Sequence, residues 1–496
     1  MTDTPDTLTQ VSPTSPTHPT AKLSGRLNTP KLILTVLALA SPLASVSGWM
    51  PLVISEGNGA GSPLVFVFVT LAFLLFSVGF TTMVRNFPRT GAFYAYITGG
   101  LGRPAGLGAS FIAMLAYLAL LVGNYAFFST AFATLLTSFT SALEFVPWCL
   151  WGLLLWSIVS TLGHFNVELS GKVLSIMMII EVVLVMTFNV AVAATGGPNG
   201  WQVQSFTPGA FLSGSLGIGV LFACACFTGF EATAIYRTEV KDPQRTIPRA
   251  TYLGVALIGM FYVMSSWALV TFYGPADAAG AATDNPSGLF EAGLRFYTGN
   301  VMAEIMICMV VTSILASTLS SHNPLARYIF ALSRDGVFPA RFGAVHPKHK
   351  SPANASLLVA AVGLAIILIA FLSRVDAIKF YSWMFGIAAY ALLLLMSATC
   401  LAVIVYFRRN AHDESMWATT IAPGLGLLSL VSMLCVVAVY FPLLIGGSTV
   451  LGSLLQLGIA AIALSGVGLA VYLRRARPHA YTHIGGETPE LAADPV

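Results

Sequence analysis

Two carboxylates inside long apolar runs are the residues of this chain best placed to do chemistry. Of the 20 Asp and Glu residues, only Glu181 and Glu231 lie well inside such runs. Glu181 is nine residues into the run 172–195, so at about 1.5 Å per residue it is roughly 14 Å deep in a hydrocarbon core about 30 Å thick. No Lys or Arg lies at a comparable depth, which favours the neutral carboxyl. We expect Glu181 to exchange a proton or bind a cation; a permanently protonated carboxyl bonded to nearby backbone is the alternative.

Two short stretches share a pattern that suits interrupted helices. Residues 44–49 read A-S-V-S-G-W and residues 225–230 read A-C-F-T-G-F. Glycine tolerates unusual backbone dihedrals, and a hydroxyl can bond a freed backbone group or a ligand. An interrupted membrane helix exposes N–H groups that suit a carboxylate and C=O groups that suit an ammonium. The pattern therefore predicts two ligand-binding interruptions; small residues that only allow close helix packing are the alternative.

The elements that must position these residues are membrane helices. The chain is 56% hydrophobic and 9% charged, against about 25% charged in an ordinary soluble domain. Apolar runs long enough to cross a bilayer, about 17–25 residues, predict an all-α membrane protein with twelve transmembrane helices near residues 32–55, 64–84, 106–136, 146–163, 172–195, 213–237, 250–273, 301–322, 354–372, 380–406, 419–442 and 451–473.

The two stretches fall in the first and sixth predicted helices, which cross in opposite directions if each unit holds five helices. That is the pattern of an inverted repeat. The predicted organisation is a core over 31–410 with repeats at 31–200 and 201–410, followed by two further helices within 411–475. The Thr/Pro/Ser-rich tail 1–30 is predicted to be disordered and lacks the pattern of a cleavable signal. Residues 476–496 form a second tail.

The basic residues predict how the chain lies in the cell membrane. If the N-terminus is cytoplasmic, all Lys and Arg except Arg295, Arg374 and Lys379 fall on the inner side, as short cytoplasmic loops prefer. Both termini are therefore predicted to be cytoplasmic. The net charge of +4 is explained by these inner loops next to anionic lipid and calls for no nucleic acid.

The residue types of metal centres and enzymes are not arranged for those roles. The six Cys all fall in or at the edge of apolar runs, and the eight His map to predicted cytoplasmic loops, tails or helix ends without metal-ligand spacing. We find no glycine loop that would cradle phosphate and no arrangement for nucleophilic attack. We expect no catalysis, no metal and no cofactor.

Three further stretches carry a resemblance to a known family. They are FPRTGAFYAYITGGLGRPAG (87–106), TEVKDPQRTIPRA (238–250) and RYIFALSRDGVFPARFGAVHP (327–347). All three resemble segments of the amino acid–polyamine–organocation permease superfamily, and with the two interruptions they cover about residues 32–410. The resemblance implies the leucine-transporter fold, a five-plus-five inverted repeat with discontinuous helices 1 and 6.

The resemblance also implies roles for individual residues. Val46, Ser47 and Gly48 would present N–H and hydroxyl groups to a substrate carboxylate. The substrate amino group would face the carbonyls of Ala44, Ala225 and Thr228, while Gly229 would allow the ligand to approach the backbone closely. The family more often has glycine at the position of Val46, and some members have a large aromatic residue at that of Ala225.

Two more positions belong to the predicted substrate site. Asn124 matches a position that contacts the substrate side chain in related permeases, and an interhelical hydrogen bond is the alternative. Ser321 belongs to a polar stripe of the eighth helix and could line the pocket, because the stripe faces the bundle rather than lipid. The stripe consists of Ser313, Ser317, Ser320 and Ser321.

The resemblance sharpens the interpretation of the two carboxylates. Many family members have Lys at the position of Glu181, where its ammonium replaces a sodium ion between helices 1 and 8, so here the charge is reversed. Glu231 matches a position implicated in proton-linked gating, and the alternative is a simple cap on the half-helix start.

The function implied is secondary active transport of amino acids or related small amines by alternating access, coupled to protons, with sodium as the alternative ion. A polyamine or organocation permease or exchanger stays open, because Glu181 and Glu231 could face a cationic substrate. A channel would need continuous helices around a pore, and a membrane sensor would keep the fold without substrate flux.

Overall fold

The computed structural model describes residues 28–87, 92–137, 145–165, 171–231, 233, 240, 242–346, 351–444 and 448–485. All regular elements in these ranges are helices. Because a bilayer offers backbone groups no water, hydrogen bonding within each helix is what lets such apolar segments cross it. Most of the predicted tails 1–30 and 476–496, and parts of the stretches 87–106 and 238–250, lie outside the described residues.

The long helices follow the predicted apolar runs. They are α1 (Thr29–Ala40), α4 (Ser62–Asn86), α6 (Arg103–Thr137), α7 (Trp148–His164), α8 (Gly171–Thr195), α10 (Leu216–Cys226), α11 (Pro243–Tyr273), α14 (Asn300–Arg334), α15 (Ala353–Leu372), α16 (Ala377–Arg409), α17 (Ala422–Leu444) and α18 (Thr449–Ala476). Short helices lie between or after them: α2 (Pro42–Ala44), α3 (Met50–Leu52), α5 (Ala92–Leu101), α9 (Pro208–Phe211), α12 (Ala278–Asp284), α13 (Leu289–Thr298) and α19 (Pro478–His483).

The apolar helices of the described residues fall into long and short ones. Nine helices in the described residues are long and apolar enough to cross a membrane. Helical turns run from Pro42 to Asn86, but Gly57 and Gly59 lie outside helical φ/ψ, so a kink separates the end of the first predicted span from the second. α7 and α10 are shorter apolar helices. α10 is short because the chain leaves the helix after Cys226. Each predicted run thus contains helix within the described residues, and the number of twelve crossings stays a prediction.

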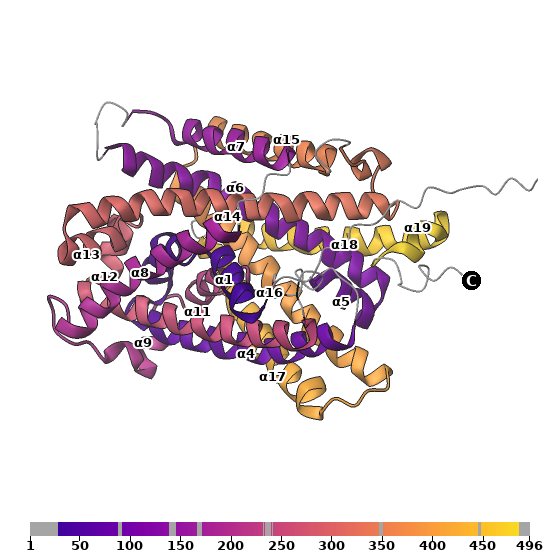
Figure 1. The fold of residues 1–496 in the computed structure, drawn as a ribbon, viewed down its shortest axis with the longest axis horizontal. Helices are drawn as coiled ribbons and strands as arrows, with labels where there is room; N and C mark the ends of the chain where they lie inside the picture. Colours follow the sequence, from indigo (N-terminus) through magenta and orange to yellow (C-terminus); the bar gives the residue numbers. More distant parts are fainter. Residues whose placement is uncertain are drawn as a thin grey trace, which may run out of the picture.

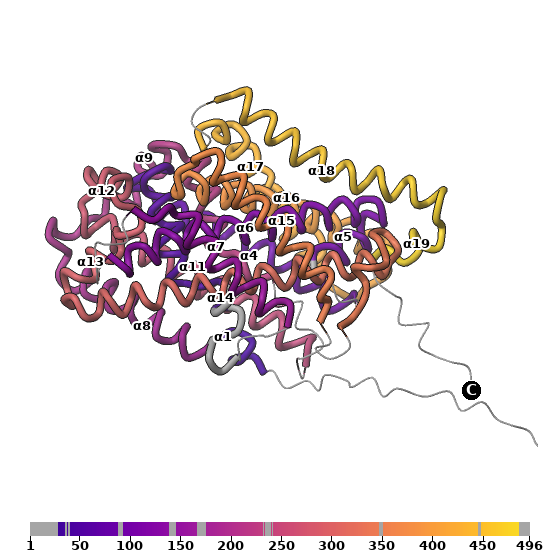
Figure 2. The backbone as a smooth tube through the Cα atoms, turned by 90° about the horizontal axis from the view of Figure 1, so that it is seen from above, coloured from indigo at the N-terminus to yellow at the C-terminus, as the bar shows by residue number. Residues whose placement is uncertain are grey.

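The long helices run roughly along one axis of the molecule (Figure 1). α4 packs beside α11, α6 lies between α14 and α16, and α7 packs on α15. The short helices α9, α12 and α13 gather at one end of this axis, and α5 and α19 lie toward the other. α18 runs along the outside of the bundle (Figure 2), where most of its apolar surface is left for lipid.

Candidate functional site

The first helix is interrupted at Ser41, before the stretch 44–49 in which the interruption was predicted. Ser41 has φ 45° and ψ 69°, a left-handed conformation, between α1 and Pro42 at the start of α2. Proline disfavours the helical conformation of the residue before it and has no N–H to donate. The predicted position is therefore wrong by a few residues, and Ser45–Trp49 forms a wide π-helical turn instead. We call Ser41 the first interruption.

Gly48 is in close contact with a side chain of another helix. A Cβ atom added to Gly48 would lie 2.3 Å from Cζ of Phe127 in α6. The next residue, Trp49, stacks on Phe385 of α16 with ring centroids 3.9 Å apart and planes 2° from parallel. Aromatic packing thus covers this side of the π-helical turn. The hydroxyl of Ser47 is buried beside it and has no hydrogen-bond partner among the described residues.

The α-helix of the sixth predicted span ends inside the stretch 225–230. α10 ends at Cys226, and Gly229 has φ +112°, which only glycine adopts without strain. The carbonyl of Ala225 accepts the N–H and the hydroxyl of Thr228, at 3.0 and 2.7 Å. The N–H of Gly229 donates to the Glu231 carboxylate at 2.8 Å. We call residues 227–231 the second interruption; within it, Glu231 caps a freed backbone N–H.

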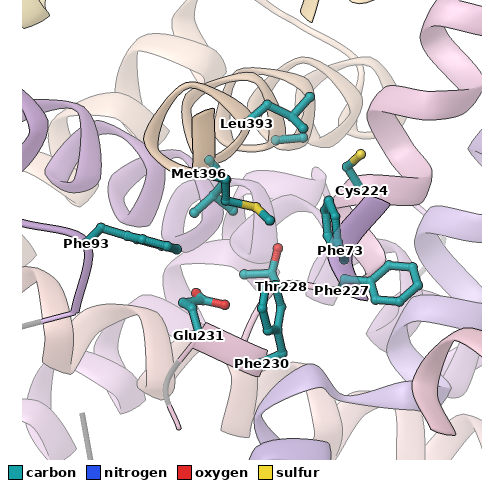
Figure 3. Close-up of a pocket in the computed structure, with 11 residues that line it drawn as sticks. Phe73, Phe93, Cys224, Phe227, Thr228, Phe230, Glu231, Leu393 and Met396 are labelled. Carbon is teal, nitrogen blue, oxygen red and sulfur yellow. The ribbon is translucent and has the colours of Figure 1, made fainter. Parts of the chain in front are cut away.

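Thr228 and Glu231 face a small pocket (Figure 3) whose cavity volume is about 10 Å³. A cavity of that size holds about one water molecule, so the pocket would have to widen before it could hold a ligand. Its lining is otherwise apolar or weakly polar and comes from α4, α5, α10, the second interruption and α16: Phe73, Phe93, Cys224, Phe227, Phe230, Ala389, Leu392, Leu393 and Met396. One carboxylate and one hydroxyl thus face a mostly aromatic and aliphatic wall.

Glu181 lies at the first interruption. Its carboxylate accepts the backbone N–H of Leu43 at 3.4 Å, and the side chain of Ser313 in α14 lies beside it. The residue is buried, and no ion pair to it occurs among the described residues. The carboxylate therefore joins α8 to the half-helix start of the first helix and to the serine stripe.

The serine stripe of α14 also contacts α6. Asn124 donates from Nδ2 to Oγ of Ser317 at 3.3 Å, while the hydroxyl of Ser321 donates to the carbonyl of Ser317 at 3.0 Å. Successive members of the stripe thus face Glu181 and Asn124. The Asn124 contact is the interhelical hydrogen bond considered as the alternative for this residue.

The predicted residues form two groups. Glu181 lies with Leu43 and Ser313, while Thr228 and Glu231 share the pocket of Figure 3, which Ser47, Asn124 and Ser321 do not line. Val46 and Ala44 are buried in the core. In the described residues, no group of His, Cys, Asp and Glu could hold a metal ion.

One partly buried acidic contact was missed from the sequence. Glu56 lies in the helical turn Val53–Asn58, beyond the predicted helix end at residue 55. Its two carboxylate oxygens accept the hydroxyl of Ser382 in α16 at 3.4 and 3.3 Å. The signal was its place next to an apolar run, but only the fold reveals the partner, which is 326 residues away.

Comparison with known proteins identifies the family. The profile described as "Amino acid permease" matches residues 44–479. The chain belongs to the amino acid permease family. It is therefore a multi-pass membrane protein of a transporter family, in agreement with its apolar helices.

Curated relatives of this permease carry several different substrate names. The "Low-affinity putrescine importer PlaP" of Escherichia coli (strain K12) is 27% identical over 320 residues, 62% of this chain and 66% of the relative. The "Branched-chain amino acid permease BcaP" of Bacillus subtilis (strain 168) is 27% identical over 314 residues, 59% and 64% of the two chains. The "Methylthioribose transporter" of the same organism is 26% identical over 330 residues, 62% and 68%. The match spans just under two thirds of the first two relatives.

Proposed function

We propose that this permease is a secondary active transporter that moves an amino acid or a related small amine by alternating access, coupled to protons. The proposal includes twelve crossings, the five-plus-five inverted repeat, and both termini in the cytoplasm. Sodium is the alternative coupling ion.

The placement of Glu181 carries the proposal. This carboxylate accepts one backbone N–H, lies beside Ser313 and has no basic partner in the described structure, so burial removes its hydration without an equivalent gain in hydrogen bonds or charge pairing. A proton is the simplest group that neutralises it. Because its partners belong to α2 and α14, gain or loss of that proton changes the contact of a half-helix with α14. Proton binding can in this way be linked to the movement of the first helix.

The substrate would bind near the π-helical turn and the second interruption. The unpartnered hydroxyl of Ser47 is a buried donor, which a substrate carboxylate can satisfy. The close contacts of Gly48 with Phe127 and of Trp49 with Phe385 leave little space there. This fits a conformation in which the site is closed. Opening the site would require the π-helical turn Ser45–Trp49 to separate from α16.

A polyamine or other organic cation is the second candidate substrate. The pocket at the second interruption combines one carboxylate with the rings of Phe73, Phe93, Phe227 and Phe230, and aromatic faces attract ammonium groups. The name of the putrescine importer among the relatives agrees with this candidate.

One experiment tests the transport proposal and separates the candidates. Purified protein is screened by thermal unfolding against amino acids, amines and polyamines, because a ligand at 100 times its Kd stabilises the native state by about 2.7 kcal/mol. Each hit is then offered to proteoliposomes under an imposed pH gradient or an imposed sodium gradient. Uphill uptake driven by the pH gradient is expected. Binding without flux would instead indicate a sensor, and downhill flux that ignores both gradients would indicate a channel or uniporter.

A further inference from the structure

Tyr262 contacts the end of α10 at the place where the second interruption begins. The residue lies in α11 and is fully buried. Its hydroxyl donates to the carbonyl of Cys226, the last residue of α10, at 2.9 Å. The last carbonyls of a helix have no N–H partner in a following turn. The hydroxyl of Tyr262 therefore supplies a donor where the interruption removes one.

The same hydroxyl also lies beside the first helix. The side chain of Ser45, at the start of the π-helical turn, is within reach of Tyr262. In the structure, Oγ of Ser45 donates to the carbonyl of Ala40, the last residue of α1 before the first interruption, at 3.1 Å. Tyr262 thus reaches the elements that flank both interruptions, although they are 181 residues apart when counted from Ser45 to Cys226.

The proton count of these hydroxyls allows two arrangements. Each hydroxyl has one proton to donate, and that of Tyr262 is used on Cys226. The proton of Ser45 can then go to Ala40 or to Tyr262, but not to both at once. In the first arrangement, the Ser45 hydroxyl bonds the Ala40 carbonyl, and this hydrogen bond bridges Ser41 within the first helix. In the second arrangement, hydrogen bonds run from Ser45 through Tyr262 to Cys226.

The ring of Tyr262 is held in place by aromatic packing. Phe227 of the second interruption meets it nearly at a right angle, with centroids 5.6 Å apart, and Phe66 of α4 packs at 5.6 Å on a tilted plane. These contacts position the hydroxyl and do not depend on it. Replacement of Tyr262 by Phe therefore removes the hydrogen bonds and keeps the packing.

We infer that Tyr262 is a positioning residue that links the two helix interruptions through hydrogen bonds. This link, which we call the tie, forms when the hydroxyl of Ser45 donates to Tyr262 and is broken when it donates to Ala40. The two half-helices then shift as one unit while the tie is made. The consequence of the tie for transport rests on the proposed function, whereas the tie is argued from the surroundings of Tyr262 alone.

Hydrogen exchange tests the tie without any substrate. The full chain in lipid nanodiscs is compared as wild type, Tyr262→Phe, Ser45→Ala and the double variant, with the amides of residues 227–231 as the readout. We expect exchange at these amides to become faster by about fivefold in each single variant, the scale of one lost buried hydrogen bond. The double variant should exchange no faster than Tyr262→Phe, because Ser45 acts on the second interruption only through Tyr262.

The control is Tyr273→Phe, in the same helix. Its hydroxyl also donates to a backbone carbonyl, that of Leu289 at 2.7 Å, away from both interruptions. It should leave residues 227–231 unchanged. Unchanged exchange there in Tyr262→Phe, or additive effects in the double variant, overturns the inference. Should Tyr262→Phe fail to fold, Ser45→Ala tests the tie from the other side, and unchanged exchange in Ser45→Ala overturns it.

A transport arm separates this inference from the proposed function. In proteoliposomes, Tyr262→Phe should lower the maximal uptake rate of a validated substrate by about fivefold with little change in its KM, since a positioning residue does not touch substrate. If wild type moves none of the screened compounds but the exchange pattern holds, the tie stands and the transport proposal fails. If wild type transports and the variant matches it in exchange and in rate, the tie fails alone.

Discussion

The carboxylate of Glu181 accepts a hydrogen bond from the backbone N–H of Leu43, 3.4 Å away and 138 residues earlier in the chain. Leu43 lies just after the left-handed Ser41, so this N–H belongs to a half-helix start that the preceding turn leaves without partners. The side chain of Ser313 in α14 lies beside the same carboxylate. A charge change on one side chain therefore acts on three helices at once.

Gly229 should tolerate no side chain, because its φ of +112° is a conformation that L residues rarely adopt. We expect Gly229→Ala to destabilise the protein by about 1–3 kcal/mol, measured by thermal or denaturant unfolding of the purified protein. The matched control is Gly254→Ala in α11, where an added Cβ meets nothing within 4 Å. That change should be neutral or stabilise by about 0.5–1 kcal/mol. Equal destabilisation by both variants would argue against a strained second interruption.

A side chain at Gly48 should clash with the neighbouring ring of Phe127 and destabilise the protein. Gly48→Ala places a Cβ 2.3 Å from Phe127, so unfolding should become easier by about 1–3 kcal/mol, the usual cost of overpacking. Phe127→Leu makes room and should recover part of this loss in the double variant, as a double-mutant cycle would measure. Strictly additive losses would show that Gly48 is required for another reason, such as close approach of a ligand to its backbone.

The hydrogen bond between Asn124 and Ser317 should be worth little on its own. Hydrogen bonds between membrane helices average about 0.6 kcal/mol in double-mutant cycles, so we expect a coupling of that size between Asn124→Ala and Ser317→Ala without substrate. Ser320→Ala, on the same stripe but without a contact to Asn124 in the described structure, is the control. If the Asn124–Ser317 coupling is absent until substrate is added, the substrate-contact interpretation of Asn124 gains support instead.

The sequence was informative wherever a local rule decided the backbone. Apolar run length predicted the helices, and Gly229 lies in the second interruption, within the sixth predicted helix. The first interruption was misplaced because the Ser-Gly pattern was given more weight than Pro42, which restricts Ser41 directly. The surroundings of Gly48 and Glu56 could not be predicted, since Phe127 and Ser382 come from helices that are distant in the chain. Tyr262 gave no signal for the same reason: one hydroxyl inside an apolar run does not reveal its partners.

Ser47 should bind the carboxylate of an amino acid substrate. Its buried hydroxyl has no partner in the described residues, so loss of the carboxylate by amidation should weaken binding by at least about 2 kcal/mol, the scale of a charge-assisted hydrogen bond. Isothermal calorimetry measures this difference, which should shrink in Ser47→Ala. Ser129→Ala is the control, because that buried hydroxyl already donates to the carbonyl of Tyr125 at 2.6 Å. An amine that binds as tightly as its parent amino acid would favour the organic-cation candidate.

Glu181→Gln should separate substrate movement from proton coupling. Glutamine has nearly the same size, keeps an oxygen that can accept the N–H of Leu43, and cannot ionise, so it imitates a carboxyl that is always protonated. We expect the variant to retain substrate binding and counterflow exchange, yet to lose uphill accumulation under an imposed pH gradient in proteoliposomes. The wild type and Glu304→Gln, which removes a carboxylate elsewhere on α14, should both accumulate substrate.

Two results would change the assignment of Glu181. A Gln variant that accumulates substrate as steeply as wild type would transfer the coupling role to Glu231, whose carboxylate bonds the N–H of Gly229 at the second interruption. Wild-type uptake that needs sodium and ignores the pH gradient would make Glu181 a cation ligand, because a carboxylate beside the hydroxyl of Ser313 offers the oxygen donors that a hard cation prefers. In that case Glu181→Gln should abolish the sodium dependence, since the ion would lose the charge that holds it in a medium of low dielectric constant.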